Sequence, residues 1–493
     1  MRLNGKPAGR ARRSMMIVTV VAAGFAAIGL VAPEELVGQG GGAQIEGRGQ
    51  GGRGGPGGGP GRGQGRGGQT PAADLPETPT AVTLPALSAE VTGPGPIFDS
   101  VPSLAPGRGL AHFAYEAREY FVSGTANGQP YRTRIVVRKP ADDARFSGLV
   151  LVESMHGSGS AHMFEYTSIY TMSSGHAAVE ILTTSPMQLV EHNEARYRDL
   201  QVGGGQTNEI LAQVGSLVRA GTPLGGQSVR RMVLSGTSMT AGVLINYLPA
   251  HMVYRTPQMQ RIFDGFMPTS NGATIQDIDV PLIHLPTMHE VAGNITRRQD
   301  GDEPGKQYRL YEFSGIAHID TRDNVRLQPN PCTLPLSQFP VQAYMSVGLH
   351  HLFEWVDKGT VPPRADRIFL DRDEHNDGSP MLLDDHGNPR GGIRNPYVDV
   401  PTAKYGIRPP AITPVIPNAS AYIAARGQAA ANQMCNLGSY QEAFSQAKLR
   451  DLYRNTRNYV SMVERRLNEL EQAKWSLPVY REMILADAAK VDF

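Results

Sequence analysis

The chain has 493 residues, with 47 basic and 46 acidic side chains and a formal net charge of +1. This near-neutral balance gives no reason to expect a polyanion such as nucleic acid as a partner. Only two cysteines are present, Cys332 and Cys435, and they do not form the C-x-x-C spacing of a metal site. In an oxidising compartment they would pair and tie the C-terminal helices to the main body, or else they stay as two buried thiols. The sequence leaves both alternatives open.

The first residues have the composition of a targeting segment. Arg10, Arg12 and Arg13 precede an almost wholly apolar run at residues 15–32. A basic stretch followed by an apolar run is typical of a secretory signal, and the length of the run also suits an uncleaved membrane anchor. We therefore expect residues 1–33 to be a signal peptide or an N-terminal anchor, which allows membrane attachment. The expected location is exported: periplasmic, extracellular or anchored to the cell envelope.

The next segment, residues 34–96, has the composition of a disordered linker. More than half of residues 40–68 are glycine, and the stretch from residue 71 to 96 is rich in proline. Such a composition cannot bury a core, so we expect a flexible spacer between the export segment and a folded domain. RGG-like repeats bind RNA in some proteins. After an export signal, a spacer is the better interpretation, and no nucleic-acid partner is expected.

From residue 114 onward, strand and helix patterns alternate, as in an α/β sheet covered by helices. Half-exposed strands are expected at residues 115–122 and 132–138, and buried strands at 149–153, 177–182 and 232–234. Three later strands are expected at 262–267, 280–285 and 308–313. Helices are expected at 208–218, 342–356 and 441–489, and a proline- and glycine-rich loop at 362–410. We predict one domain at residues 97–493, with a mostly parallel central sheet and C-terminal helices from about residue 411 packed on it.

Residues 231–248 read RMVLSGTSMTAGVLINYL and carry the most specific motif of the chain. A short apolar strand, a Gly-x-Ser turn and an apolar helix follow one another, which is the layout of a nucleophile elbow. This layout places Ser238 at the top of a sheet, at the positive end of the following helix. The motif G-x-S-x-G ends in glycine, whereas here the last position is Thr240. The alternative is a serine-rich loop that only caps the helix.

A nucleophilic serine needs a histidine as base and a carboxylate that orients the histidine. Glu290 follows the strand expected at residues 280–285, and His318 follows the strand expected at 308–313. Ser238, Glu290 and His318 therefore occur in the order typical of α/β-hydrolases. The alternatives for the acid are Asp264, Asp300 and Asp302, and those for the base are His284 and His289.

An acyl-transfer site also needs two N–H donors for the oxyanion. One is expected from the backbone of Met239, directly after the serine. The other is expected from the loop after the strand at residues 149–153, at Met155 or His156. This loop is glycine-rich but lacks the Walker lysine and the dinucleotide fingerprint, so no cofactor is predicted. A metal-dependent hydrolase using His156, His162 and His176 lacks a zinc-type spacing, so no metal is predicted.

Several segments resemble the bacterial family of alpha/beta hydrolase domain-containing proteins, from about residue 115 to near the C-terminus. The segments that carry the resemblance are YRTRIVVRKPADDARFSGLVLVES, GTSMTAGVLINYL, IFDGFMP, RLYEFSGIAHID, EWVDKGTVPPRA, DDHGNPRGGIRNPYVDVP and LRDLYRNTRNYV. The resemblance implies an α/β-hydrolase fold and carboxylic ester hydrolysis with Ser238, Glu290 and His318 as triad. It also implies that a small hydroxyl residue is usual two positions after the serine. The loop at Ser154, Met155 and His156 departs from the family, whose members carry a Trp-Leu-Asn type of run.

These patterns together predict an exported serine hydrolase that cleaves a small-molecule or polymeric carboxylic ester through an acyl-enzyme. An amidase or a lactonase would use the same triad, because all three reactions pass through a tetrahedral oxyanion. A third alternative is the same fold used without catalysis, as a binding module on a glycine-rich stalk.

Overall fold

The structure is a computed structural model that describes residues 75–293, 295–371 and 380–493. The predicted targeting segment and residues 34–74 of the predicted linker lie outside the described residues. Within the described ranges, none of the helices combines the length and the apolar character needed to cross a membrane.

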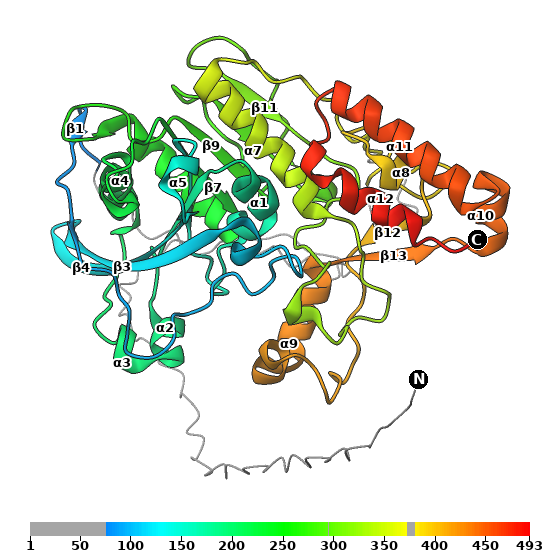
Figure 1. The fold of residues 1–493 in the computed structure, drawn as a ribbon, viewed down its shortest axis with the longest axis horizontal. Helices are drawn as coiled ribbons and strands as arrows, with labels where there is room; N and C mark the ends of the chain where they lie inside the picture. The colour runs from blue at the N-terminus through cyan, green and yellow to red at the C-terminus, as the bar shows by residue number, and fades with distance from the viewer. Residues whose placement is uncertain (1–74, 294, 372–379) are drawn as a thin grey trace, which may run out of the picture. The chain divides into compact units, whose positions relative to one another are not determined.

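The described chain is built around a nine-stranded sheet with the strand order β11-β10-β9-β7-β5-β6-β4-β3-β2 (Figure 1). Its strands are β2 (Ala86–Leu87), β3 (Tyr115–Ala126), β4 (Gln129–Pro140), β5 (Leu149–Ser154), β6 (Ala177–Ile181), β7 (Arg231–Thr237), β9 (Gly265–Thr269), β10 (Leu282–His284) and β11 (Tyr308–Leu310). The six strands from β6 to β11 in this order are parallel to one another. The strands β2, β3, β4 and β6 pair antiparallel at the other edge.

The central strands are formed by short apolar runs. Every residue of β5 and of β6 is buried, as expected for parallel strands that are covered on both faces. Each predicted strand has a counterpart in the structure, but β9 begins at Gly265 instead of residue 262, and β10 and β11 are shorter than predicted. The strands β3 and β4 are longer than predicted because they form one extended hairpin. Since the parallel strands all end at the same edge, the loops that follow β5, β7, β10 and β11 meet there.

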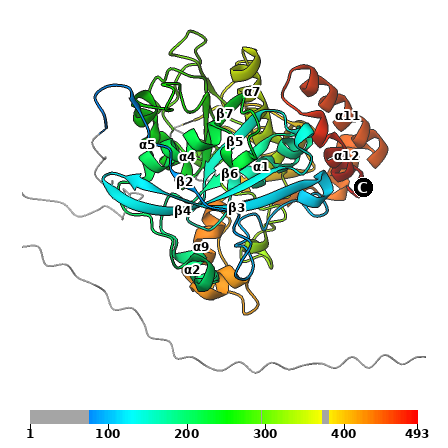
Figure 2. The same cartoon turned by 60° about the vertical axis from the view of Figure 1, so that its left-hand side comes forward.

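Two pairs of helices cover the two faces of the sheet (Figure 2). On one face, α1 (His162–Ser173) and α7 (Val341–Lys358) belong to one buried apolar cluster. On the other face, α4 (Thr207–Arg219) and α5 (Met239–Val253) belong to a second cluster. The predicted amphipathic helix at 208–218 is confirmed, since its periodic apolar residues are all buried, namely Ile210, Leu211, Val214 and Leu217.

The C-terminal helices α10 (Gln446–Tyr453), α11 (Thr456–Gln472) and α12 (Arg481–Ala489) pack against the cluster that contains α1 and α7 (Figure 1). The start of the predicted helical segment is instead strand β13 (Ser439–Ala443), which pairs antiparallel with β12 (Ala403–Ile407). The prediction of a proline- and glycine-rich loop at 362–410 was therefore wrong at residues 403–407. Both strands are mixed in polarity, and their partners lie far apart in sequence, so no local pattern indicated the pairing.

The remaining elements lie around the ends of the main sheet. They are α2 (Met187–His192), α3 (Glu194–Tyr197), α6 (Met288–Ala292), α8 (Pro396–Asp399), α9 (Ala421–Leu437), β1 (Thr80–Ala81) and β8 (Tyr254–Arg255). Residues 75–96, which the sequence placed in the linker, contribute β1, paired with β8, and β2, paired with β3. Pairing at an edge uses only backbone groups, which a proline-rich composition does not reveal.

The two cysteines form a disulfide. The Cα atoms of Cys332 and Cys435 are 5.7 Å apart, and the bond links the loop after β11 to helix α9. Around the disulfide, Leu327, Leu336 and Met434 form a small buried apolar cluster. Of the two alternatives left open by the sequence, the structure has the paired cysteines.

Candidate active site

Ser238 lies at a sharp turn between β7 and α5. Its backbone has φ 54° and ψ −116°, a strained conformation for a residue that carries a side chain. Gly236 is required beside it, because a Cβ atom there would lie 2.4 Å from the carbonyl oxygen of Thr240. The Thr240 hydroxyl accepts a hydrogen bond from the Thr237 N–H at 3.0 Å and donates to the Thr237 carbonyl at 2.9 Å. Threonine therefore closes the turn at the position where the motif has glycine.

Three predicted side chains form one hydrogen-bonded chain at the carboxyl edge of the sheet. The Ser238 Oγ atom lies 2.7 Å from Nε2 of His318, and Nδ1 of His318 lies 2.6 Å from Oε1 of Glu290. Ser238 follows β7, Glu290 lies on α6 after β10, and His318 lies in the loop after β11. The side chains of His318 and Glu290 are each 11% exposed, so the chain of bonds is largely shielded from water.

The carboxylate of Glu290 is held by its own helix. Its Oε2 atom accepts hydrogen bonds from the Thr287 N–H at 2.8 Å and from the Thr287 hydroxyl at 2.7 Å. Thr287 and Glu290 form a capping box at the start of α6, which fixes the orientation of the carboxylate. Burial by itself raises the pKa of Glu290, but the hydrogen bond and charge of His318, with the bonds from Thr287, lower it to about 2. The group is thus ionised at neutral pH and orients the Nδ1–H of His318.

The alternative acids have other partners. Asp264 accepts hydrogen bonds from the Arg219 side chain at 2.6 Å and from the Met232 N–H at 2.7 Å. Asp300 accepts from Arg367 at 2.8 Å, and Asp302 accepts from Arg364 at 2.6 Å. None of these three carboxylates forms a hydrogen bond with His318 in the described structure.

The alternative bases also have other partners. His284 is buried, with Nδ1 at 3.1 Å from the Tyr308 hydroxyl and Nε2 at 2.6 Å from the Asn271 carbonyl. His289 is buried, and its Nδ1 accepts from the backbone N–H of His318 at 3.0 Å. The bond between His289 and His318 and the bonds from Thr287 to Glu290 were not predicted from the sequence, because neither His289 nor Thr287 forms part of a catalytic motif.

The backbone N–H groups of Met155 and His156 already have acceptors. The Met155 N–H donates to the Ile181 carbonyl at 2.8 Å, which extends the β5–β6 pairing by one residue. The His156 N–H donates to the Ser160 carbonyl at 2.9 Å, which closes the turn of the loop. The expectation that one of these two N–H groups faces an oxyanion therefore does not fit the structure.

Two N–H groups, one after β5 and one after β7, have no hydrogen-bond acceptor among the described residues. Within the loop of residues 155–159, the described structure gives an acceptor to every N–H except that of Gly157. Met239 is the first residue of α5, and its N–H likewise has no acceptor among the described residues. The two residues are neighbours, since a Cβ atom on Gly157 would lie 2.3 Å from Cε of Met239. Gly157 and Met239 are both exposed residues, so neither is covered by another part of the described chain.

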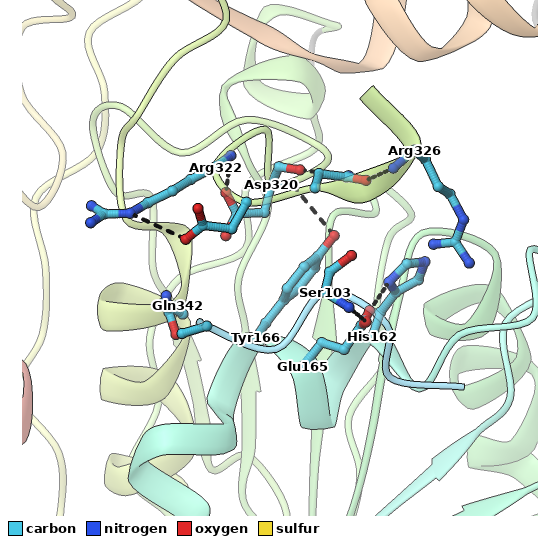
Figure 3. A pocket seen from close by; sticks show the side chains of 11 residues that line it. Ser103, His162, Glu165, Tyr166, Asp320, Arg322, Arg326 and Gln342 are labelled. Atoms are coloured by element: carbon cyan, nitrogen blue, oxygen red, sulfur yellow. Dashed lines mark hydrogen bonds and ion pairs between the residues drawn. The ribbon is translucent and has the colours of Figure 1, made fainter. Parts of the chain in front are cut away.

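The glycine loop is braced by polar side chains from two other segments, and Figure 3 shows His162, Glu165 and Arg326 among them. The Ser158 hydroxyl lies 3.1 Å from Nε2 of His162, whose Nδ1 lies 3.0 Å from Oε2 of Glu165. Arg326 donates to the Ser158 carbonyl at 3.2 Å and to the Ser160 hydroxyl at 2.7 Å. These bonds hold the backbone of residues 158–160, and thereby Gly157, in one arrangement.

His162, Glu165 and Arg326 also line a small polar cavity, together with Asp320, which comes two residues after His318 (Figure 3). Its volume is about 20 Å³, enough for about one water molecule. Asp320 lines it, and burial raises the pKa of this carboxyl to about 7, although the Arg322 N–H bonded to it acts in the opposite direction. The cavity is too small to hold a substrate.

The three histidines of the alternative metal site do not converge. The rings of His156 and His162 have centroids 4.9 Å apart. His176 lies instead beside Ser147, with Nδ1 at 2.7 Å from the serine hydroxyl. Among the described residues, no group of three or more histidine, cysteine or acidic side chains is arranged to hold a metal ion.

Known proteins show similarity to this chain at two levels. The family model for the alpha/beta hydrolase domain matches residues 85–486. Esterase Est22 is 14% identical with a TM-score of 0.26, over 34% of this chain and 48% of that protein. A thermostable esterase from Pseudomonas putida ECU1011 is 16% identical with a TM-score of 0.22, over 32% of this chain and 46% of that protein. The match thus spans less than half the length of either esterase. A search of curated proteins finds no match.

The family match covers nearly all of the described residues, from β2 to α12. The strand order, the helices on both faces and the C-terminal helices confirm the predicted fold class. The chain belongs to the alpha/beta hydrolase domain family.

Proposed function

We propose that this protein is a serine hydrolase that cleaves a carboxylic ester, with Ser238 as nucleophile, His318 as general base and acid, and Glu290 as the orienting carboxylate. One observation carries the proposal. The hydrogen-bonded chain joins Ser238 Oγ to His318 Nε2 at 2.7 Å and His318 Nδ1 to Glu290 Oε1 at 2.6 Å. Nucleophile, base and orienting acid in this arrangement are what acyl transfer through a serine requires.

The first half of the proposed reaction forms an acyl-enzyme. The Ser238 Oγ attacks the ester carbonyl carbon while His318 Nε2 takes the hydroxyl proton, and the carbonyl oxygen becomes an oxyanion. The N–H groups of Met239 and Gly157 would bind that oxyanion, at the positive end of α5. The tetrahedral intermediate then expels the alcohol, which receives the proton from His318.

The second half returns the enzyme to its starting state. Water gives a proton to His318 Nε2 and attacks the acyl carbon, and a second oxyanion forms at the same two N–H groups. The intermediate expels Ser238 Oγ, which recovers its proton from His318, and the carboxylic acid leaves. In both halves the ionised Glu290 stabilises the positive charge on the imidazolium.

An amide or a lactone would follow the same steps, so these substrates remain the second candidates. Esters are proposed first because an alcohol is a better leaving group than an amine and needs less assistance. A binding module without catalysis is the third candidate, and the strained conformation of Ser238 argues against it. Strain of this kind persists mainly at functional sites, where the surrounding structure maintains it.

We also propose that the protein is exported, with a small-molecule or polymeric ester as its substrate. The disulfide between Cys332 and Cys435 supports the location, because stable disulfides occur mainly in oxidising compartments. Fractionation of the source cells, with detection of the protein by an antibody, tests this proposal. Recovery of the protein in the cytoplasmic fraction with both thiols free would refute it.

Hydrolysis of short-chain p-nitrophenyl esters by the wild type and by Ser238→Ala tests the central proposal. We expect activity in the wild type and a loss of about a thousandfold or more in the variant. Parallel assays with the corresponding anilides and with small lactones distinguish the three substrate classes. Equal ester hydrolysis by the two proteins would refute the assignment of Ser238.

A further inference from the structure

The buried side chain of His289 contacts the main chain of His318. Nδ1 of His289 accepts a hydrogen bond from the His318 N–H at 3.0 Å, and Nε2 lies 3.2 Å from the carbonyl oxygen of Asn436. One ring nitrogen thus faces a donor and the other faces an acceptor. Only the neutral tautomer with hydrogen on Nε2 satisfies both contacts.

The neutral state of His289 is stable under ordinary conditions. The residue is only 5% exposed, and burial lowers the pKa of its imidazole to about 3, although the nearby charge of Glu290 acts in the opposite direction. The Nδ1 lone pair therefore stays available to the His318 N–H at neutral pH. His289 itself does not touch Ser238, so its contribution acts through the backbone of His318.

The last residues of helix α9 provide the hydrogen-bond acceptor for Nε2 of His289. Asn436 and Leu437 are its last two residues, and carbonyl groups at a helix end lack partners within the helix. The Asn436 carbonyl accepts from His289, and the Leu437 carbonyl accepts from the N–H of Ile319 at 3.2 Å. The end of α9 thus holds His318 indirectly through His289, and directly holds the residue after it.

The end of α9 is covalently fixed. Cys435, directly before Asn436, forms the disulfide with Cys332. Ile319 packs against the small apolar cluster around this disulfide. The bond therefore links α9 to the chain segment that follows His318, so the support and the supported loop move together.

We infer that His289 is a positioning residue for His318, and that the Cys332–Cys435 disulfide anchors this support by fixing the end of α9. The inference rests on the proposed function, in which His318 is the general base. The imidazole must stay aligned with both Ser238 and Glu290, and a displacement of about 1 Å at a reacting group costs about a hundredfold in rate.

Two substitutions of His289 separate its two hydrogen bonds. In His289→Asn the amide oxygen takes the place of Nδ1 and keeps the bond from His318, while the bond to Asn436 is lost. In His289→Gln the amide nitrogen takes the place of Nε2 and keeps the bond to Asn436, while the bond from His318 is lost. Both variants remove a buried ring, so their losses of melting temperature should be similar.

We expect His289→Gln to lower kcat for a p-nitrophenyl ester by about ten- to a hundredfold with little change in KM. His289→Asn should retain kcat to within about threefold, because the contact that it preserves is the one to His318. The matched controls are His176→Asn and His176→Gln. His176 is equally buried and has a lowered pKa, but it bonds Ser147 at the opposite edge of the sheet. Its variants should lose stability without this difference in kcat.

Amide hydrogen exchange of the peptide that contains His318 and Ile319 gives a second readout, which does not depend on activity. Exchange should accelerate in His289→Gln, and also after reduction of the disulfide or in a Cys332→Ser/Cys435→Ser variant. Equal kcat and equal exchange in the two His289 variants, or unchanged exchange after reduction, would overturn the inference. If the wild type hydrolyses no ester, the proposed function fails, whereas the exchange experiment still decides whether His289 and the disulfide hold the His318 loop.

Discussion

Replacing Glu290 by glutamine tests the role of the carboxylate through the tautomer of His318. Both Thr287 donors point at one oxygen of Glu290, at 2.7 and 2.8 Å, so the amide oxygen of glutamine must take that place. The amide NH₂ then faces Nδ1 of His318, which has to act as acceptor and therefore loses its hydrogen. The hydrogen moves to Nε2, where it prevents the ring from taking the proton of Ser238. We expect kcat to fall by about 10⁴-fold, the size of effect caused by a wrong tautomer in a serine protease.

The same substitution has a calculable effect on stability. The pKa of Glu290 is lowered from 4.5 to about 2 in the folded protein, which corresponds to about 3 kcal/mol at neutral pH. Because the folded pKa is the lower one, this stabilisation is present above pH 4.5 and is lost as the pH falls towards 2. Glutamine keeps the bonds from Thr287, so the free energy of unfolding of Glu290→Gln at pH 7 should fall by less than this amount. In urea unfolding, the free energy of unfolding of Glu290→Gln should also depend less on pH between pH 4.5 and 2 than that of the wild type.

Asp279→Asn is the matched control. Asp279 also bonds a buried histidine, His251, at 3.0 Å, and its pKa is likewise lowered to about 2. Asp279 precedes β10, whereas Glu290 follows β10, so Asp279→Asn should lose comparable stability and keep kcat. Initial rates with p-nitrophenyl acetate and urea unfolding at several pH values measure both effects. Retention of kcat within about tenfold in Glu290→Gln would refute the tautomer argument.

Three further substitutions test the turn, the proposed oxyanion site and the loop of His318. Gly236→Ala should destabilise the protein by about 2 kcal/mol or more in urea unfolding, because the new Cβ meets the backbone of Thr240 at 2.4 Å; an unchanged midpoint would contradict this. Gly157→Ala keeps the backbone N–H but adds a methyl group beside it, which should hinder access of an oxyanion to that N–H and lower kcat/KM by about tenfold or more. The melting temperature should not fall, because the side chain of Met239, 2.3 Å from the new Cβ, is flexible and gives way. If Gly157→Ala/Met239→Ala recovers full activity, steric contact with Met239 explains the loss and the Gly157 N–H does not. Asp320 has its pKa raised from 3.8 to about 7, so its protonated form stabilises the fold and stability falls as the pH rises through this range; Asp320→Asn should flatten that slope, which is about 1.4 kcal/mol per pH unit at most.

The three residues of the hydrogen-bonded chain could be predicted because each one follows a strand with a clear local pattern. The apolar strand, the turn and the helix around Ser238 are contiguous in sequence. Glu290 and His318 lie in the segments that follow the apolar strands β10 and β11, and parallel strands bring such segments to one edge. The chain order of serine, acid and histidine then selected these residues among several acidic residues and histidines.

The donors at the oxyanion position could not be assigned from the sequence because hydrogen bonding of the backbone depends on distant segments. Met155 does not fit as an oxyanion donor because its N–H bonds Ile181 on the neighbouring strand, and His156 does not fit because its N–H bonds Ser160 within the turn. Gly157 stands out only when the partners of each N–H are known. The contacts of α9 with His289 and Ile319 could not be predicted for the same reason, since they join segments more than a hundred residues apart.

Mass spectrometry of the protein after reaction with a fluorophosphonate tests the central claim most directly. We expect one covalent adduct per chain, located on Ser238 by peptide mapping, and no adduct in Ser238→Ala. Labelling should also be strongly slowed in Glu290→Gln, because His318 would no longer accept the serine proton. An adduct on another residue, or no adduct on a wild-type protein that hydrolyses esters, would contradict the assignment of Ser238 as the nucleophile.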